Sequence, residues 1–333
     1  MALTLDKLVD LLKASGEPTR LRLLALLAAG DLTVSDLTDI LGQSQPRISR
    51  HLKLLAEADL VDRYQEGAWA YFRLKQEGDA VALARQLLDA ASDTDSVLLR
   101  DGERLLSVKR ARAEKAQAYF SRNAAEWDEL RRLHVNDKAV EANLLQLLGT
   151  EPVDALLDLG TGTGRILQLL EHHYRRAVGI DASRDMLAVA RANLDKAGIV
   201  KASVRQGDIL NLPLDDGEFD VVIIHQVLHF LVEPEAALRE AARMLKPGGR
   251  LAVIDLAPHA LEHLRDDHAH IRLGFSHQVM EEWLSRAGFT PSAAVDVAPS
   301  QRHDEALTAT IWLAARKAEP LGEVLNLKRV GGV

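Results

Sequence analysis

The N-terminal pattern of apolar and polar positions predicts four short helices. Leucines recur at helical spacing in TLDKLVDLLKAS (4–15), and EPTRLRLLALLAAG (17–30) has a proline in its first turn and a glycine at its end. The third helix, TVSDLTDILG (33–42), opens with a capping-box pattern and ends at a glycine. The fourth, SQPRISRHLKLL (44–55), opens with Ser44, a residue type preferred at helix N-caps.

The alternation that follows these helices predicts a hairpin. LVDRYQEGAWAYFRL (60–74) alternates on both sides of Glu66-Gly67, a turn signal. Four helices and a two-stranded hairpin make a winged helix-turn-helix, for which we expect residues 1–95. Residues 96–119 are predicted to form a helical linker, in which Lys and Arg outnumber Asp and Glu. A solvated helix face and a second contact with nucleic-acid phosphates would each account for that excess.

From about residue 120 to 317, strand-like and helix-like segments alternate. The predicted strands are ALLDLG, RAVGID, ASVRQGD, FDVVIIHQ, RLAVIDLA, SAAVDVA and ALTATIWLAA. Such alternation predicts a doubly wound, mostly parallel α/β sheet. Since no helical pattern separates the last two strands, we expect the sheet to end in an antiparallel hairpin. The tail, 318–333, has no clear periodicity.

Composition narrows the class of protein. The 333 residues contain 47% hydrophobic and 27% charged side chains, values typical of globular chains long enough for two cores. There is no membrane-length apolar run, and the N-terminus lacks a secretory pattern, so a cytoplasmic location is expected. Because the chain has 0 cysteines, thiolate metal sites and cysteine nucleophiles are excluded. The net charge of -8 argues against a general nucleic-acid coat but allows one local basic patch.

The fourth predicted helix carries that basic patch. Its apolar positions Ile48, Leu52 and Leu55 share one face, and its basic positions lie on the other faces. Arginine can bind guanine through two hydrogen bonds in the major groove, and hydroxyl, amide and ammonium groups can bind phosphates or bases. The candidate DNA contacts are Ser44, Gln45, Arg47, Ser49, Arg50, His51 and Lys53, with Arg63 and Arg73 on the wing.

These segments, EPTRLRLLALL and LGQSQPRISRHLKLLAEADLV, resemble the ArsR-type family of bacterial repressors over about residues 4–75. The resemblance implies a homodimer on a palindromic double-stranded operator, with the residues from Ser44 to His51 named above facing DNA. Metal-sensing members carry cysteines in the helix that here reads DLTVSDL, or Asp and His on the dimerisation helix that here reads AVALARQLLDAASD. Because neither ligand set is present, no regulatory metal is expected.

A glycine-rich turn follows the first strand of the second domain. ALLDLGTGTGRILQLL places Gly160, Gly162 and Gly164 between a strand and a helix, where the backbone can turn tightly and a ligand can approach it. A dinucleotide fingerprint requires a sixth-position glycine, where this chain has Arg165. A GxGxG turn preceded by Asp158 is instead the pattern of S-adenosylmethionine enzymes, whose cofactor is positively charged at its sulfonium and ammonium groups.

Acidic residues end the next two strands. Asp181 ends RAVGID, where a carboxylate can accept hydrogen bonds from both ribose hydroxyls. Asp208 ends ASVRQGD, where it can bind the adenine amino group while Ile209 packs on the ring. Any one aspartate can be a simple loop cap, but three of them together with the glycines indicate a nucleoside site.

This half is similar to the class I S-adenosylmethionine-dependent methyltransferases over about residues 115–317, above all in FDVVIIHQVLHFLVEPEAALREAARMLKPGGRLAVIDL. The resemblance implies the strand order 3-2-1-4-5-7-6 with strand 7 antiparallel. It assigns Asp158 and the three glycines to the methionine end, Asp181 to ribose, and Asp208 and Ile209 to adenine. It also assigns His225 and Gln226 to the cofactor wall, and AYFSRNAAEWDEL to a cap helix. Tyr119 would cover the site from that helix, although a plain amphipathic helix fits the same pattern.

The sequence does not identify a catalytic residue. Histidines crowd between 259 and 277, and His229, His268 and His270 are candidates for a base or a substrate contact; a polar insertion explains the same pattern. HAHIRLGFS is also similar to the corresponding segment of proteins that fuse ArsR and methyltransferase domains. Without cysteine, methylation of arsenic bound to thiols is not expected.

Two functions fit these motifs. The favoured one is a DNA-binding regulator whose second domain binds S-adenosylmethionine or S-adenosylhomocysteine, an arrangement suited to sensing the methionine cycle. The alternative is a methyltransferase of an unidentified small molecule with an attached repressor domain. Methylation of nucleic acid is disfavoured, because HQVL (225–228) stands where an aromatic-proline motif would be expected.

Overall fold

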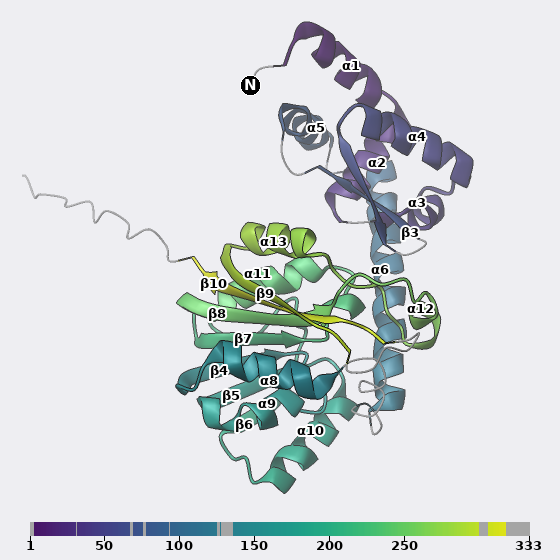
Figure 1. Ribbon diagram of the computed structural model, residues 1–333. Helices are drawn as coiled ribbons and strands as arrows, with labels where there is room; N and C mark the ends of the chain where they lie inside the picture. Colours follow the sequence, from purple (N-terminus) through teal and green to yellow (C-terminus); the bar gives the residue numbers. More distant parts are fainter. Residues whose placement is uncertain are drawn as a thin grey trace, which may run out of the picture.

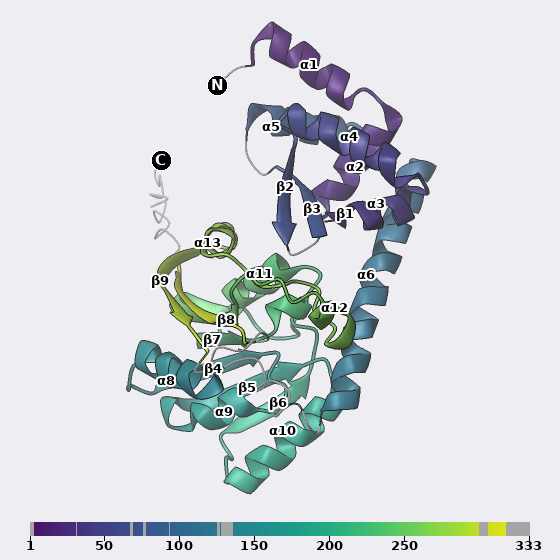
Figure 2. The same cartoon turned by 45° about the vertical axis from the view of Figure 1, so that its right-hand side comes forward.

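The computed structural model describes residues 3–30, 32–66, 69–75, 78–92, 94–124, 127, 136–299 and 306–317; for 64–66, 69, 112, 113 and 115–117 it describes the backbone alone. Two domains stand one above the other, and one long helix runs along both of them (Figures 1 and 2). The predicted turn at Glu66-Gly67, most of the cap segment after Asn123 and the tail 318–333 lie partly or wholly outside the described residues.

The N-terminal domain is a winged helix-turn-helix, as predicted. Its helices are α1 (Leu5–Ser15), α2 (Pro18–Ala28), α3 (Val34–Leu41), α4 (Gln45–Glu57) and α5 (Asp79–Asp89), and its strands are β1 (Leu32–Thr33), β2 (Val61–Glu66) and β3 (Trp69–Leu74). The capping box of α3 is confirmed, because the side chains of Thr33 and Asp36 each bind the other's backbone N–H. The two-residue strand β1, which no alternation announces, pairs with β3 and makes the wing sheet three-stranded.

Helix α6 (Ser96–Asn123) is longer than the predicted linker and belongs to both domains. It packs against α2 and α3 of the winged helix and against α10 of the second domain. At its N-terminal end Arg22 binds Asp101 through two hydrogen bonds of 2.6 Å, and Arg104 donates to the carbonyl of Ile40 at 2.8 Å. The helix is therefore fixed to the winged helix rather than tethered beside it.

The second domain is built on a seven-stranded sheet. Its strands are β4 (Val153–Leu159), β5 (Tyr174–Asp181), β6 (Ala202–Gln206), β7 (Phe219–His225), β8 (Leu245–Leu256), β9 (Phe289–Val297) and β10 (Ala309–Arg316). Their order is β6-β5-β4-β7-β8-β10-β9, and β10 is antiparallel to both neighbours. Numbered within the domain, this is 3-2-1-4-5-7-6, so the expected order and the terminal antiparallel pair are confirmed.

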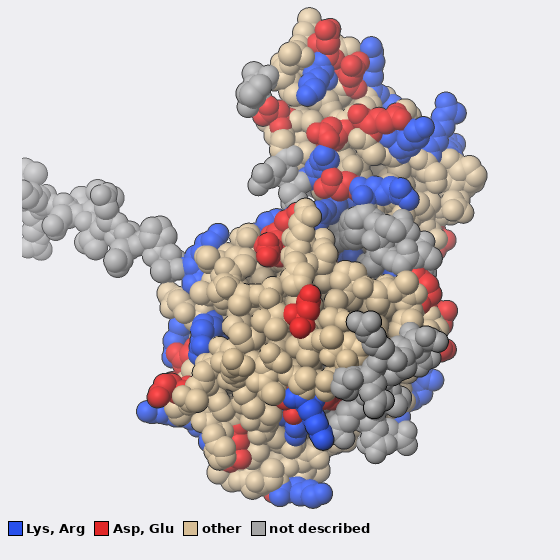
Figure 3. Space-filling view, viewed as in Figure 1, with Lys and Arg blue, Asp and Glu red and all other residues tan. Residues whose placement is uncertain are grey.

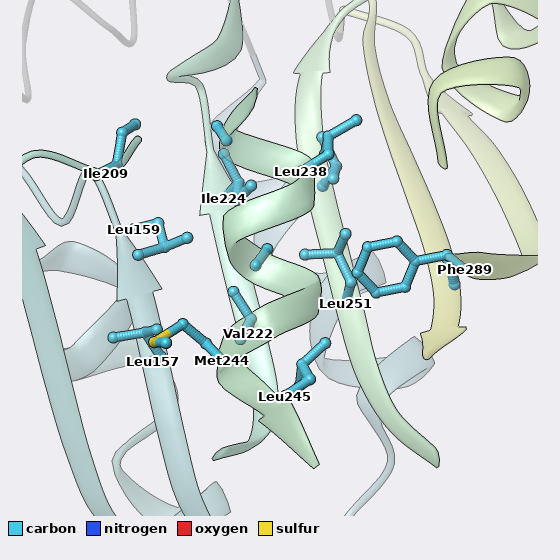
Figure 4. Packing of buried hydrophobic residues seen from close by; sticks show 14 of the residues in the cluster. Leu157, Leu159, Ile209, Val222, Ile224, Leu238, Met244, Leu245, Leu251 and Phe289 are labelled. Carbon is cyan, nitrogen blue, oxygen red and sulfur yellow. The ribbon is translucent and has the colours of Figure 1, made fainter. Parts of the chain in front are cut away.

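Alternate side chains of the strands point to opposite faces of the sheet and make two cores. Leu157, Val222 and Val253 pack against α11 and α13, whereas Leu156 and Val221 pack against α8 and α9 on the other face. Figure 4 shows the first core beneath α11. The covering helices are α8 (Asp137–Leu148), α9 (Arg165–Leu169), α10 (Arg184–Ala197), α11 (Pro234–Met244), α12 (His263–Asp267) and α13 (His277–Arg286), with short 3-10 turns η1 (Glu171–His173) and η2 (Leu228–Phe230).

Candidate functional site

A cavity of about 940 Å³ opens where the central parallel strands end. The glycine turn after β4 forms its floor, and the chain there passes very close to the segment after β7. At Gly160, where φ is +74°, an added Cβ would lie 2.3 Å from a methyl carbon of Val227. Only glycine allows both this left-handed backbone and this approach. Open crevices at the carboxyl ends of parallel strands are the usual ligand sites of such sheets.

The three predicted carboxylates all line this cavity. Asp158 is buried at the end of β4, and Asp208 is exposed beyond the end of β6, where its carboxylate accepts from the N–H of Leu210 at 2.9 Å. Asp181 accepts from the N–H groups of Gly162 and Ser183, each at 2.8 Å. Burial raises the pKa of Asp181, although these backbone donors act in the opposite direction.

Two buried polar atoms of the cavity wall have no hydrogen-bond partner among the described residues: Nε2 of Gln226 and Oγ1 of Thr161. Gln226 also has a positive φ of 54°, which is uncommon for a residue other than glycine. A donor amide, a hydroxyl and the carboxylate of Asp158 in one cavity wall are groups that can bind the carboxylate and the ammonium of an amino acid. Of the other predicted cofactor residues, the buried His225 and Ile209 also line the cavity, as do Gly160 and Gly162, whereas Gly164 does not.

An aromatic group forms part of the cavity wall. Phe120, Trp127 and Phe230 line the cavity, and their ring centroids lie 4.6 to 6.1 Å apart. The predicted cover, Tyr119, does not line the cavity; its ring packs behind Phe120, and its hydroxyl lies 2.6 Å from Nδ1 of His268.

Helix α6 supplies a further wall. Leu106, Lys109 and Arg110 line the cavity together with Glu233, the residue before α11. Nζ of Lys109 lies 2.5 Å from a carboxylate oxygen of Glu233 and donates to the carbonyl of Ala29 at 3.2 Å. Since Ala29 is the C-cap of α2, this lysine joins the cavity wall to the winged helix.

The histidine candidates separate in the structure. His229 does not line the cavity; it is buried, and its Nδ1 lies 2.6 Å from a carboxylate oxygen of Asp255, which is fully buried. The ring of His270 packs against those of His229 and Phe230, with centroids 4.4 and 5.1 Å apart. His229 and His270 therefore support the aromatic wall from behind.

Most of the candidate DNA contacts at α4 are exposed to solvent. The exposed ones are Ser44, Gln45, Arg47, Ser49, Arg50 and Lys53. In Figure 3, Lys and Arg side chains (blue) lie over the part of the winged helix where Figure 1 labels α4. Ser44 occupies the N-cap, but its side chain makes no capping hydrogen bond. Its hydroxyl is thus available to another partner.

Three other candidates lie differently. His51 is only 13% exposed and its Nδ1 lies 3.7 Å from Glu17; burial, opposed by that carboxylate, lowers its pKa. Arg63 is exposed on β2. Arg73 on β3 lies 3.6 Å from Asp62 and 3.4 Å from Glu282 of α13, so it faces the second domain.

Several cavity residues were not anticipated from the sequence. They include Leu106, Lys109, Arg110, Phe120, Trp127, Thr161, Thr163, Ser183, Met186, Phe230, Leu231, Val232 and Glu233. Those on the glycine turn and α10 follow from their neighbours in the chain. For the residues on α6, the helical periodicity of the sequence predicts which side chains share a face but not which domain that face contacts.

Within the part of the chain that the structure describes, no group of three or more histidine or acidic side chains is placed to hold a metal ion. None of the described helices is long and apolar enough to cross a membrane.

Comparison with known proteins gives a separate match for each domain. Residues 17–63 match the model of the bacterial regulatory protein arsR family, and residues 157–253 match a methyltransferase domain model. One chain in the solved complex of the Haloferax volcanii Trm112 methyltransferase activator is similar in structure, with a TM-score of 0.50 and 23% identity, covering 60% of this chain and 97% of that one. That likeness concerns the fold alone.

Curated relatives match over shorter stretches. An uncharacterized 37.1 kDa protein of a Streptomyces fradiae transposon is 37% identical over 119 residues, which are 35% of this chain and 34% of the relative. Arsenite methyltransferase of Aquipseudomonas alcaligenes is 39% identical over 111 residues, 30% of this chain and 32% of that enzyme. The chain thus spans about a third of the length of these relatives.

Proposed function

We propose that this protein, which joins an ArsR-family helix-turn-helix to a methyltransferase domain, is a DNA-binding regulator whose C-terminal domain binds S-adenosylmethionine or S-adenosylhomocysteine. The observation that carries the proposal is the double attachment of α6. Its first turns are bonded to α2 and α3 through Asp101 and Arg104, while Lys109 and Arg110 form part of the cavity wall. A ligand that moves this wall therefore acts on a helix that is part of the DNA-binding domain.

The cavity suits the proposed cofactor in charge and in shape. Asp158 and Gln226 would hold the methionine end at the glycine turn, Asp181 the ribose, and Asp208 with Ile209 the adenine. S-adenosylmethionine, when bound, supplies an electrophilic methyl group on a sulfonium. S-adenosylhomocysteine lacks that positive charge, so a site with several carboxylates can distinguish the two molecules.

A homodimer is part of the proposal. Helix α1 exposes an apolar stripe, Leu5, Val9 and Leu12, whose exposed fractions are 75%, 38% and 45%. Apolar side chains at this helical spacing on a surface indicate burial against another element. Pairing through α1 and the neighbouring α5, which the family resemblance assigns to dimerisation, would present two α4 helices to the two halves of a palindromic operator.

A second candidate function is methyl transfer to a small molecule, and the aromatic wall favours it. Phe120, Trp127 and Phe230 extend the cavity beyond the residues that a nucleoside needs, leaving room for an acceptor. The acceptor's lone pair would form a bond to the methyl carbon as the carbon–sulfur bond breaks, releasing S-adenosylhomocysteine. The likeness to an arsenite methyltransferase does not suggest arsenite as the acceptor, because this chain has 0 cysteines to bind arsenic.

The decisive experiment is a DNA titration at three ligand conditions. A labelled duplex, selected from random-sequence DNA with the wild-type protein, is titrated with protein alone, with S-adenosylmethionine and with S-adenosylhomocysteine. We expect the affinity for DNA to differ in at least one condition, and the difference to disappear in Asp181→Asn. Equal affinities in all three conditions, with calorimetry showing that the ligands bind, would overturn the regulatory proposal. Transfer of label from methyl-labelled cofactor to cell extract tests the second candidate.

A further inference from the structure

The wing is packed against the methyltransferase domain. In both views the β2–β3 hairpin extends from the winged helix toward the lower domain (Figures 1 and 2). Tyr71 of β3 is 1% exposed, and its hydroxyl donates to the carbonyl of Ile271 at 3.1 Å. The guanidinium of Arg272 lies 4.6 Å from the centre of the Tyr71 ring, within the range of a cation–π interaction. Residues 265–272, called here the docking segment, thus enclose a side chain of the wing.

A second contact involves a candidate DNA-binding residue. Arg73 is 14% exposed and lies 3.4 Å from Glu282, which is on α13 of the methyltransferase domain. Arg265 of the docking segment is also buried; its guanidinium contacts the carbonyl of Ile271 and lies 3.5 Å from the Tyr71 hydroxyl. A guanidinium that faces a carboxylate cannot at the same time neutralise a DNA phosphate with the same N–H groups.

The docking segment is also tied to the cavity wall. The N–H groups of Ile271 and Arg272 both donate to the carbonyl of His229, each at 2.9 Å. The next residue, Phe230, lines the cavity and packs on Phe120. His229 is itself held by Asp255, which also accepts from the N–H of Leu228 at 2.9 Å. The backbone carbonyl of His229 therefore links the cavity wall, which a ligand would contact, to the docking segment, which binds the wing.

We propose that the docking segment and Glu282 form a binding surface for the wing of the same chain, and that DNA competes with this surface for the wing through Arg73. The docked wing is withheld from DNA, and its release increases DNA affinity. While the docked form predominates, a variant that weakens docking raises the undocked population, and hence the DNA affinity, by the same factor. Control of docking by a ligand on Phe230 rests on the proposed function; the competition itself does not.

The first test uses charge-matched variants on α13 without any ligand. Glu282→Gln removes the carboxylate that faces Arg73, whereas Glu281→Gln makes the same change of charge at the neighbouring exposed position. Binding of the selected duplex is followed by fluorescence anisotropy. We expect Glu282→Gln to raise the affinity about two- to fivefold over Glu281→Gln, the effect of one partly exposed ion pair. Equal affinities of the two variants would overturn the competition.

The second test removes the hydroxyl of the wing. Tyr71→Phe keeps the ring between its neighbours but loses the bond to Ile271, so we expect about two- to tenfold tighter DNA binding. Hydrogen exchange of peptides covering 265–273 should quicken in Tyr71→Phe and Glu282→Gln but not in Glu281→Gln. If exchange there is unchanged in both docking variants, the wing does not dock on this segment in solution.

The third test adds S-adenosylhomocysteine and separates the two proposals. If wild-type DNA affinity responds to the ligand, the response should shrink in Tyr71→Phe; an undiminished response would show that the wing does not transmit it. If calorimetry shows that both S-adenosylhomocysteine and S-adenosylmethionine bind and neither changes wild-type DNA affinity, but Glu282→Gln still binds DNA more tightly than Glu281→Gln, the regulatory proposal fails and the docking surface stands.

Discussion

Replacing Gly160 by alanine tests how the glycine turn forms the cofactor cavity. The substitution introduces two costs: a left-handed backbone at φ +74° and a Cβ that lies 2.3 Å from a methyl carbon of Val227. Gly198, at the C-terminal end of α10, has a similar φ of +70° and nothing within 4 Å of an added Cβ, so Gly198→Ala carries the backbone cost alone. That cost is about 1 kcal/mol. Crowding in a packed region adds about 1–3 kcal/mol.

The expected outcome is a difference between the two variants in both stability and binding. Gly198→Ala should lose about 1 kcal/mol of unfolding free energy and keep its affinity for S-adenosylhomocysteine. Gly160→Ala should lose about 2–4 kcal/mol or displace Val227, which lines the cavity beside Gln226. Displacement that costs binding about 2 kcal/mol weakens the affinity about 30-fold. Urea denaturation and calorimetry measure these quantities; wild-type affinity in Gly160→Ala would refute the reasoning.

Three further predictions concern charged groups. Arg50→Ala should weaken DNA binding by about 1–3 kcal/mol if Arg50 contacts a base, whereas Arg191→Ala, at an exposed position of α10, should leave DNA binding unchanged. Fluorescence anisotropy at several salt concentrations measures both affinities, and equal losses would refute the assignment. Burial raises the pKa of Asp181, and ribose hydroxyls donate best to its charged form, so the affinity for S-adenosylhomocysteine should fall as the pH drops through that raised pKa. The Asp181→Asn variant should bind the ligand more weakly and show no such pH dependence. Calorimetry at several pH values measures both effects. Because the pKa of Asp181 is higher in the folded state, the unfolded chain loses this proton first as the pH rises. The stability of the folded state should therefore fall between the unfolded pKa and the folded pKa of Asp181. Arg22→Met leaves the carboxylate of Asp101, which is 3% exposed, without its two hydrogen bonds, so the free energy of unfolding should fall by about 2–4 kcal/mol. The double variant that also carries Asp101→Asn should recover part of this loss, and no recovery would contradict the pairing.

The fold was predictable because its signals are local. Buried strands such as ALLDLG and FDVVIIHQ are mostly apolar, and the capping box at Thr33 and the glycine at 42 mark the ends of α3 in the sequence itself. The carboxylates of the cavity were predictable for a related reason. They end parallel strands, and the topology brings the ends of parallel strands together.

What could not be predicted depends on contacts between distant segments. A cover by an aromatic residue of α6 was expected at Tyr119, but the phase of the helix turns Phe120 to the cavity instead. Nothing local shows that His229 pairs with Asp255, or that Arg73 faces Glu282 across more than two hundred positions. Each of these depends on contacts between segments that are distant along the chain, within one domain or between the two, and hydrophobic periodicity does not encode such contacts.

The central claim is that the cavity and the DNA-binding surface are energetically coupled, and one calorimetric comparison tests it most directly. The affinity for S-adenosylhomocysteine is measured with free protein and with protein saturated by the selected duplex. Linkage requires the ligand affinity to change by the same factor by which the ligand changes DNA affinity. We predict such a matched change, and an identical ligand affinity in the two states would contradict the account.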